Sequence, residues 1–447
     1  MIKSLTLANY KCFADDSKLE LRPITLLFGY NNTGKSALLR ALVLLSASLR
    51  GKPGAPISLD HEAARGCLFQ DLTGELAFKT RRGFEFCFEF EDSVVKSATW
   101  AINEFPDLKK QVVVHFGIEF QQFSCDAYWM PSGSPRSDFK EPYYVVDGSN
   151  AHVRELHTNA DSNAHLEFSG LLPEGLSHGN TPYDQLLEVA LKDLKGLGMD
   201  VKWLGPRRVH GERSLVFRGI TPISIDPDGG GALDILATEA AQSGGELGIL
   251  GTNVSAWFER YLGRRLRINW QSERYNLVLE PTQKTKELES QYGVNLADSG
   301  EGLMQVLPLL VSLSMLKRGD RYDPTILALE EPESHLHPRL HTALAESILE
   351  TIREGRNSKV VVETHSEIIL LRIQRAIAEG LDHNKVIVYW IRQIDSGKTV
   401  LEPVEFDELG RPNGNMPPTI FAEDSRQAKL LLDSQRAGLS KSPQSNS

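Results

Sequence analysis

The chain has 447 residues, 41% apolar and 24% charged, which is the composition of a globular protein rather than a disordered one. Lys and Arg number 49 against 59 Asp and Glu, and the net charge of −10 argues against nonspecific coating of nucleic acid but not against a local basic groove. The sequence contains no apolar run long enough for a membrane span and no apolar core of a signal peptide. Its four cysteines form no CxxC pair, which excludes a zinc ribbon or a disulfide scaffold and favours a cytoplasmic location.

The predicted elements begin with a strand, a glycine-rich loop and a helix. Residues 24–28 form a short apolar run typical of buried strands, and residues 36–49 are rich in helix formers with apolar side chains on most faces. From about residue 68 to 175, short alternating or β-branched runs separated by Gly, Pro, Ser and Asn indicate antiparallel strands.

The second half of the chain alternates helices with strands. Helices are predicted at residues 183–197 and 303–317, from about 339 and from about 366, and strands at 325–329 and 359–363. This alternation favours a parallel α/β core. The polar residues 434–447 are predicted to be disordered.

An octapeptide between the first strand and the first helix, GYNNTGKS at residues 29–36, matches the phosphate-loop pattern GxxxxGK[ST] in full. Its glycines let the loop curl so that backbone N–H groups point at phosphate oxygens, the lysine reaches the β- and γ-phosphates, and the serine ligates Mg²⁺. The residues expected to surround the nucleotide are Gly29, Asn31, Asn32, Thr33, Gly34, Lys35, Ser36 and Ala37. The sequence therefore predicts a site for a nucleoside triphosphate with Mg²⁺.

Two later strands end in polar side chains. Glu330 and Glu331 follow strand 325–329, and His365 follows strand 359–363. Ligands bind at the carboxyl ends of strands in open α/β sheets, so we expect these side chains near the phosphates. Glu330 would hold Mg²⁺ through water, together with Ser36, and Glu331 would activate the attacking water as a general base. His365 would hydrogen-bond the γ-phosphate or that water.

A second anion site is indicated at residues 298–302, DSGEG, where a serine and a glycine-rich turn precede the apolar helix 303–317. The order of phosphate loop, serine-glycine turn, acidic strand and strand with histidine resembles the ATP-binding-cassette (ABC) class of P-loop ATPases. More narrowly, it is similar to the soluble branch that contains RecF, the structural-maintenance-of-chromosomes (SMC) proteins and the OLD-family ATPases. Within this branch the chain most resembles the compact ATPases of bacterial antiphage defence systems, such as the Septu type.

The resemblance spans residues 2 to about 372. It is carried by NYKCF (9–13), the phosphate loop, LGPRR (204–208), residues 298–308, EEPESHLHP (330–338) and ETHSE (363–367), and residues 407–421 resemble a small C-terminal extension of these ATPases. The implied fold is α/β: an ABC-type P-loop NTPase head with an antiparallel β lobe and a helical signature subdomain. The expected parts of this head (1–433) are residues 1–75 and 319–400 for the nucleotide lobe, 76–200 for the β-rich lobe, 201–318 for the signature subdomain and 401–433 for the extension.

The resemblance also implies that two heads dimerise around two ATP molecules, as a homodimer or a higher even oligomer. The signature residues Ser299, Gly300, Glu301 and Gly302 would then contact the nucleotide of the partner chain in trans. Lys11 and Gln70 would lie beside the nucleotide, with Gln70 as the glutamine that links the lobes. Ser334, His335 and His337 would lie in the loop that crosses the dimer axis.

The chain departs from the families that it resembles at four points. Its signature is Ser-Gly-Glu-Gly rather than Ser-Gly-Gly-Gln, and Glu330 stands where most P-loop ATPases have Asp. No DxD pattern of a Toprim nuclease follows Glu367, so we expect no intrinsic nuclease activity. No long heptad array provides the coiled-coil arm of an SMC protein.

The sequence thus favours a Mg²⁺-dependent ATPase that senses nucleic acid or phage infection and regulates a separate effector, such as a nuclease or toxin, without a membrane partner. The alternatives are a RecF-like DNA-repair clamp and a structural scaffold with negligible turnover. GTP is disfavoured because residues 384–387, NKVI, lack the aspartate of the guanine-binding NKxD pattern. The basic clusters that could touch DNA are Arg81 with Arg82, Arg207 with Arg208, and Arg264 with Arg265 and Arg267.

Overall fold

The structure is a computed structural model, and it describes most of the chain. The described residues are 1–50, 55–74, 83–105, 110–121, 124–129, 143–147, 152–154, 167–174, 182–208, 212–219, 222, 224–282, 293–319, 325–354, 357–394, 397–413 and 429–431. The predicted disordered tail and most of the predicted C-terminal extension lie outside these residues.

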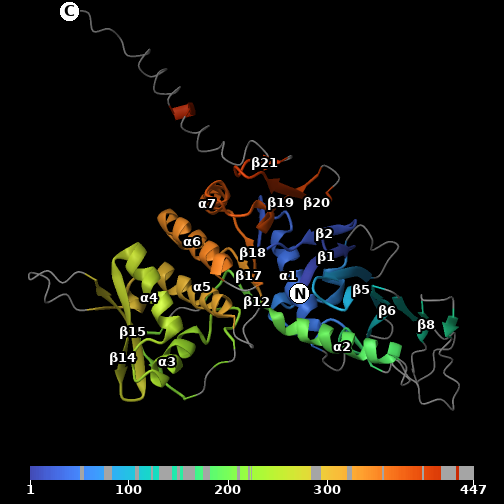
Figure 1. The fold of residues 1–447 in the computed structure, drawn as a ribbon, viewed down its shortest axis with the longest axis horizontal. Helices are drawn as coiled ribbons and strands as arrows, with labels where there is room; N and C mark the ends of the chain where they lie inside the picture. Colours follow the sequence, from blue (N-terminus) through green and yellow to red (C-terminus); the bar gives the residue numbers. More distant parts are fainter. Residues whose placement is uncertain are drawn as a thin grey trace, which may run out of the picture.

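A seven-stranded sheet forms the centre of the molecule (Figure 1). Its strands, in spatial order, are β12 (Val201–Leu204), β17 (Ile326–Glu330), β18 (Lys359–Glu363), β3 (Ile24–Gly29), β19 (Val386–Gln393), β20 (Thr399–Phe406) and β21 (Pro412–Asn413). The first five are parallel, and the last two extend the sheet in antiparallel pairing. The parallel α/β core expected from the sequence is therefore present.

Both faces of this sheet are buried, which explains the continuous apolar runs of its strands. On one face, Ile326 and Ala328 of β17 join a core with helix α1 (Lys35–Ser48). On the other face, Leu327 and Leu329 join a core with α5 (Glu301–Arg318), α6 (Pro338–Glu354) and α7 (Glu367–Ala378). Alternate residues along β17 thus face opposite layers, so Glu330 faces α1.

An eight-stranded antiparallel sheet lies beside α1. Its order is β2 (Ser17–Glu20), β1 (Ile2–Ala8), β4 (Gly83–Phe90), β5 (Val95–Phe105), β6 (Lys110–Phe120), β7 (Ser124–Trp129), β8 (Tyr143–Asp147) and β9 (His152–Arg154). Aromatic residues fill its inner face: Phe86 stacks on Trp100 with centroids 5.1 Å apart, and the Trp100 indole donates to the Leu171 carbonyl. A two-stranded sheet, β10 (Glu167–Ser169) with β11 (Leu172–Glu174), and helix α2 (Pro182–Asp200) complete this lobe. The structure contains the expected antiparallel strands in this part of the chain, and their sheet also includes β1 and β2 from the N-terminal residues.

The third part lies on the opposite side of the core sheet (Figure 1). It contains α3 (Ala232–Gln242), α4 (Ile249–Leu262) and α5, together with an antiparallel sheet of β13 (Leu215–Val216), β15 (Arg274–Pro281), β14 (Arg264–Gln271) and β16 (Val294–Asn295). The predicted boundary at residue 201 needs correction, because β12 pairs with β17 and belongs to the core sheet. A four-residue strand carries too short a pattern to reveal which sheet it joins.

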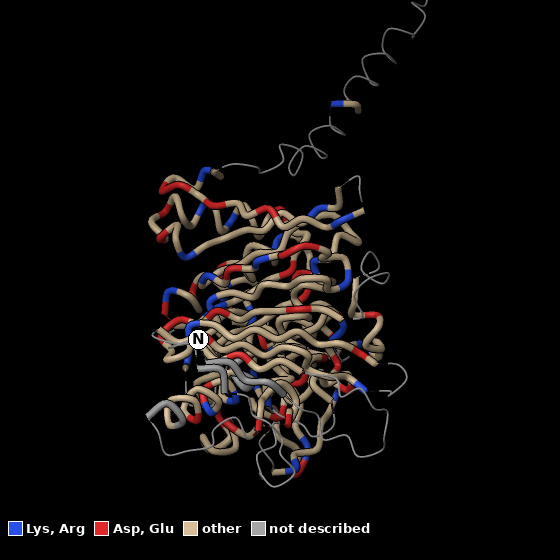
Figure 2. Tube along the Cα trace, turned by 90° about the vertical axis from the view of Figure 1, so that its right-hand side faces the viewer, with Lys and Arg blue, Asp and Glu red and all other residues tan. Residues whose placement is uncertain are grey.

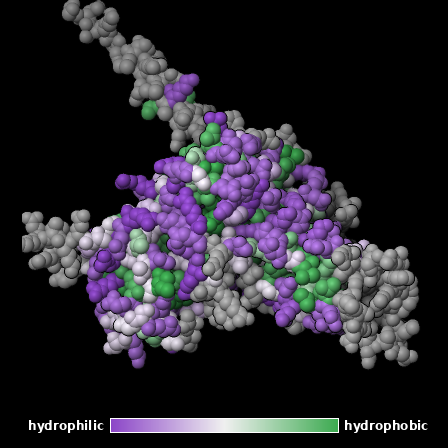
Figure 3. All heavy atoms as spheres, viewed as in Figure 1, coloured by the Kyte–Doolittle hydropathy of each residue, from purple (hydrophilic) through white to green (hydrophobic). Residues whose placement is uncertain are grey.

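The surface is mainly hydrophilic in the view of Figure 3, with apolar patches over α2 and over the helical part. Leu186 and Val189 of α2 and Ile249 at the start of α4 are among the exposed apolar side chains. None of the helices in the described ranges combines the length and the apolar character needed to cross a membrane. All four cysteines are free thiols.

A buried lysine joins the core sheet to the antiparallel lobe. Lys359, the first residue of β18, donates from Nζ to the carbonyls of Ile2 (2.9 Å) and Leu21 (2.8 Å) and pairs with Glu91 (2.7 Å). We expect Lys359→Ala to lower the free energy of unfolding by about 3 kcal/mol, because it leaves two buried carbonyls without a donor. Denaturant titration would measure this loss.

Lys398→Ala is the matched control for this prediction. Lys398 also pairs with an acid, Asp15, but its side chain is 37% exposed and that of Asp15 is 78% exposed, so the loss of Lys398 should cost less than about 1 kcal/mol. Equal effects of the two substitutions would refute a special role for Lys359 in joining the two sheets.

Candidate nucleotide-binding site

The phosphate loop connects the end of β3 to the start of α1, as the sequence predicts. Gly34 caps the helix in the left-handed region (φ 98°), and a Cβ at this position would lie 2.5 Å from Cys12 Sγ. At Gly29 a Cβ would collide with the carbonyl of Ile391 on β19. Gly34 is therefore required by its left-handed backbone conformation and by close packing, and Gly29 is required by close packing.

Lys35 is folded back onto its own loop. Its Nζ donates to the carbonyls of Gly29 (3.0 Å) and Tyr30 (2.6 Å), and the side chain is 3% exposed. Burial lowers the pKa of Lys35, while the nearby Glu363 and Glu331 oppose this effect. The ammonium group therefore lies inside the loop, where phosphate oxygens would compete with the two carbonyls for its protons.

Two carboxylates face α1 from neighbouring strands. Glu330 of β17 and Glu363 of β18 are register partners, and Ser36 and Arg40 lie one helical turn apart on α1. Ser36 Oγ donates to Glu363 Oε1 at 2.5 Å. Arg40 donates to both carboxylate oxygens of Glu330, from Nε to Oε2 at 2.9 Å and from the NH2 group to Oε1. The sequence predicts that Ser36 acts together with Glu330, whereas in the structure the hydroxyl of Ser36 is bonded to Glu363.

Glu363 was not among the predicted site residues. Its side chain is 1% exposed, and within the described residues its Oε2 atom has no hydrogen-bond partner. Burial raises the pKa of Glu363 to about 7, with smaller contributions from Glu330 and Glu331, while the Ser36 hydroxyl and Lys35 lower it. One sequence signal could have identified it: like Glu330, it is an acid at the end of an apolar strand.

Glu331 and His365 lie at the same sheet edge. Glu331 has a positive φ of 44°, its N–H donates to the Glu363 carbonyl, and its Oε2 accepts from Ser334 Oγ at 3.0 Å. His365 Nε2 lies 3.8 Å from Glu331 Oε1. Burial, and then Lys35, lower the pKa of His365, which favours a neutral imidazole at neutral pH. The structure therefore brings Lys35, Ser36, Glu331 and His365 together.

Glu333 holds the histidine loop in place, and sequence reasoning missed it. One of its carboxylate oxygens, Oε1, accepts from Thr364 Oγ1 (2.7 Å) and from the His365 N–H (2.8 Å). The side chain is 8% exposed. Its sequence signal is its place in the EEPESHLHP motif, two residues after Glu331.

The possible DNA contacts need one correction. Arg208 is 5% exposed, and its NH2 group donates to the carbonyls of Glu330 and Glu331, each at 3.3 Å. Burial lowers the pKa of Arg208 to about 10, and the acids of this loop oppose that effect. Because it is buried beneath the acidic loop, Arg208 cannot form part of a surface for DNA.

In the described basic cluster at residues 264–267, two of the arginines form ion pairs with acids of the same chain. Arg265 pairs with Glu259 (3.0 Å) and Arg267 with Glu280 (3.3 Å). Arg81 and Arg82 lie outside the described residues. In Figure 2, basic and acidic residues are interspersed along the described chain.

The predicted signature turn sits at the N-terminus of α5. Gly300 caps this helix with a φ of 109°, Ser299 Oγ donates to the Leu296 carbonyl (2.6 Å), and Glu301 Oε1 accepts from Gln305. A Cβ on Gly302 would lie 2.5 Å from the carbonyl oxygen of His335. The turn therefore packs against the 330–338 loop of its own chain, and Gly300 and Glu301 are exposed.

Lys11 and Gln70 lie at the edge of the antiparallel lobe. The Lys11 ammonium is 3.9 Å from Cys67 Sγ, and the Lys11 N–H donates to the Leu72 carbonyl. Gln70 lies exposed in the short 3-10 helix Phe69–Leu72. The described contacts of Lys11 and Gln70 are with residues 67–73 of the antiparallel lobe. It is the neighbouring Cys12 that packs against the phosphate loop, at Gly34.

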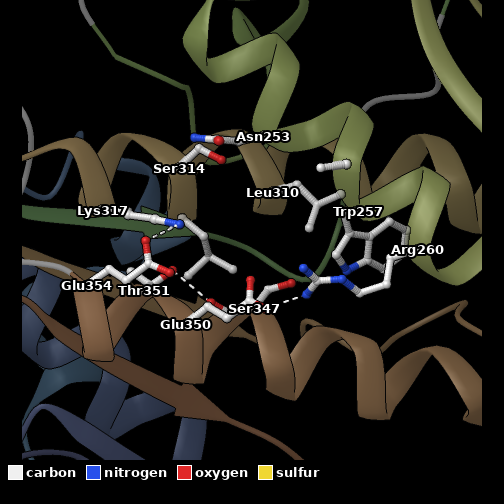
Figure 4. Close-up of a pocket in the computed structure, with 12 residues that line it drawn as sticks. Asn253, Trp257, Arg260, Leu310, Ser314, Lys317, Ser347, Glu350, Thr351 and Glu354 are labelled. Atoms are coloured by element: carbon white, nitrogen blue, oxygen red, sulfur yellow. Dashed lines mark hydrogen bonds and ion pairs between the residues drawn. The ribbon is translucent and has the colours of Figure 1, made fainter.

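A separate pocket of about 220 Å³ opens between α4, α5 and α6 (Figure 4). Two ion pairs, Arg260 with Glu350 and Lys317 with Glu354 (2.6 Å), line it beside Trp257. Residues of the phosphate loop and the acidic strand ends do not line this pocket. Its charges are paired with one another, so it is distinct from the site at the sheet edge.

Comparison with known proteins places the chain in a family. Residues 1–162 and 258–370 match the family described as AAA ATPase domain. The chain belongs to this family. No curated protein matches the sequence. Together with the observed sheet order and the antiparallel lobe, family membership confirms the predicted fold class, an ABC-type P-loop ATPase head.

Three solved structures are similar to this ATPase domain. An SMC head bound to the C-terminal winged-helix domain of ScpA has 13% identity, covers 90% of this chain and 98% of its own, and has a TM-score of 0.45. The SMC head domain from Thermotoga maritima has 11% identity, coverages of 90% and 99%, and a TM-score of 0.39. An SMC head with an extended coiled coil, bound to the C-terminal domain of ScpA derived from Pyrococcus furiosus, has 13% identity, coverages of 97% and 99%, and a TM-score of 0.44.

Proposed function

We propose that this ATPase domain binds ATP with Mg²⁺ at the end of β3 and hydrolyses it there. The observation that carries the proposal is the convergence of Lys35, Ser36, Glu331 and His365 at one sheet edge. The loop amides and the Lys35 ammonium would hold the phosphates. The carboxylate of Glu331 would accept the proton of the attacking water, and the neutral His365 would donate a hydrogen bond to the γ-phosphate.

The residues around Ser36 fit a hard divalent cation. They offer a hydroxyl and carboxylate oxygens, and the buried Glu363 Oε2 has no partner within the described residues. Mg²⁺ bound here would neutralise charge on the phosphates. In the sequence-based assignment the ligands are Ser36 and Glu330.

We further propose that two copies of the chain close head to head around ATP. Gly300 and Glu301 are exposed at the positive end of an 18-residue helix, where backbone N–H groups are available to an anion. Ser299, Gly300, Glu301 and Gly302 would bind the γ-phosphate held by the partner subunit. The packing of Gly302 on His335 would couple this contact to the loop carrying Ser334 and His337.

The proposed role of this cycle is to sense nucleic acid or phage infection and to regulate a separate effector, such as a nuclease or toxin. Support comes from the EEPESHLHP and ETHSE motifs, which resemble those of antiphage-defence ATPases. Glu331 favours this role over that of a structural scaffold, because a scaffold has no need of a catalytic base.

The test is the steady-state rate of ATP hydrolysis by the purified protein, with and without duplex DNA, and with EDTA as the metal-free control. We expect hydrolysis that requires Mg²⁺ and rises with DNA. A rate that DNA leaves unchanged would exclude duplex DNA as the trigger. ATP binding with no turnover in any condition would favour the scaffold, and absence of ATP binding would refute the nucleotide site.

A further inference from the structure

We propose that Glu363, and not Glu330, is the carboxylate that holds the divalent cation with Ser36. Glu330 instead fixes α1 on the core sheet through Arg40. This inference rests on the proposed nucleotide function and assigns a residue to the same site. Four features of the structure support it: strand order, hydrogen bonding, charge and burial.

Strand order places Glu363 nearer to the phosphate loop. β18 is the direct neighbour of β3, whereas β17 lies one strand farther away. Neighbouring strands are about 4.8 Å apart, so the backbone of Glu330 starts roughly that much farther from β3 than the backbone of Glu363. Consistent with this order, the Ser36 hydroxyl reaches Glu363 at 2.5 Å.

Charge separates the two acids. Both oxygens of Glu330 are engaged by the Arg40 guanidinium, a bidentate pair that satisfies the carboxylate and neutralises its charge. Taking Glu330 away to a metal ion would leave Arg40, which is 15% exposed, without its partner. In the described part of the structure, Glu363 has no such cationic partner bound to it: the hydrogen bond that its carboxylate accepts comes from the neutral hydroxyl of Ser36.

Burial points to a missing partner for Glu363. Its Oε2 atom is shielded from water and, within the described chain, accepts no hydrogen bond. An oxygen in this position is costly unless a donor or a metal ion satisfies it. Glu331, the proposed general base, has a carboxylate oxygen within 4.8 Å of Glu363, so a cation held by Glu363 would lie beside the reacting groups. The Glu363 carboxylate and the Ser36 hydroxyl supply oxygen atoms, which are the ligands that a hard cation prefers.

The test uses Mn²⁺, whose binding is measured by electron paramagnetic resonance in the presence of a non-hydrolysable ATP analogue. Wild type, Glu363→Gln and Glu330→Gln are compared. We expect Glu363→Gln to weaken Mn²⁺ binding at least about tenfold, since loss of even an outer partner of a metal ligand has an effect of this size. Affinity for the analogue in EDTA should stay within about twofold, which also shows that the variant is folded.

Glu330→Gln is the matched comparison, because it makes the same change on the neighbouring strand. It should lower the melting temperature by loosening Arg40, and it should weaken Mn²⁺ binding less than Glu363→Gln does. Wild-type Mn²⁺ affinity in Glu363→Gln, or a larger loss in Glu330→Gln, overturns the inference. If wild type fails to bind the analogue, the proposed function is refuted. Mn²⁺ binding measured without nucleotide then tests the cation site separately, and a larger loss in Glu363→Gln than in Glu330→Gln would still support Glu363 as the ligand.

Discussion

Replacing Glu331 with glutamine is expected to leave ATP binding intact and to lower the rate of hydrolysis by about 10²- to 10⁴-fold, the usual contribution of a general base. Glutamine keeps the shape of the side chain and can still accept from Ser334 Oγ, but it cannot take a proton from water. The positive φ of residue 331 and its N–H bond to the Glu363 carbonyl are backbone features, and the substitution preserves them. Steady-state phosphate release would measure the loss.

The same variant should accumulate as an ATP-bound dimer, because in the proposed cycle it is hydrolysis that reopens the two heads. Size-exclusion chromatography with light scattering, with ATP and with ADP, would detect it. Glu354→Gln is a suitable control, since Glu354 pairs with Lys317 away from the phosphate loop, and this variant should hydrolyse ATP at the wild-type rate. Hydrolysis by Glu331→Gln at the wild-type rate would show that another group is the base.

Removing the ammonium group of Lys35 is expected to weaken ATP binding at least about 100-fold, or roughly 2.7 kcal/mol of binding free energy. Lys35 is the cation inside the phosphate loop, where it now donates to two backbone carbonyls. Its loss would remove the charge-assisted hydrogen bonds that we propose it makes to the β- and γ-phosphates. Calorimetric titration of Lys35→Ala with ATP and Mg²⁺ would measure the change. The same loss of affinity is expected when Lys35→Ala is titrated with a non-hydrolysable ATP analogue in EDTA, because the contact between the lysine and the phosphates does not need the metal.

Lys35→Ala also alters the empty protein, so its stability must be measured alongside binding. The carbonyls of Gly29 and Tyr30 lose their donor, and we expect a loss of about 1–3 kcal/mol in the free energy of unfolding. Lys317→Ala controls for the removal of a partly buried lysine elsewhere, and it should leave ATP affinity unchanged. A folded Lys35→Ala protein that binds ATP as tightly as wild type would contradict the assignment of the phosphate loop.

Much of the site was predictable because its parts are local in sequence. The phosphate loop is eight consecutive residues between a strand and a helix, and the structure contains that strand as β3 and that helix as α1. The acidic pair at residues 330–331 and the histidine at 365 end strands of the same parallel sheet, so their shared edge followed from the alternation of elements.

The misassignments concern contacts between segments far apart in the chain. The basic pair at residues 207–208 predicts a possible DNA contact, yet Arg208 is buried against the carbonyls of Glu330 and Glu331, more than a hundred residues away in the chain. β12 was assigned to the helical subdomain, yet it forms the edge of the core sheet. Neither contact can be read from the local sequence, because a single arginine and a four-residue strand are both too short to show a periodic pattern.

The phosphate loop, the polar strand ends and the parallel core can all be predicted from the sequence, because each depends on neighbouring residues or on a repeating pattern. Which carboxylate meets Ser36 depends instead on the folded chain. The order of strands in the sheet places β18 between β17 and β3, so Glu363 reaches the serine while Glu330 pairs with Arg40 one turn along α1. Strand order arises from how helices and loops cross the sheet, and no stretch of sequence encodes it alone.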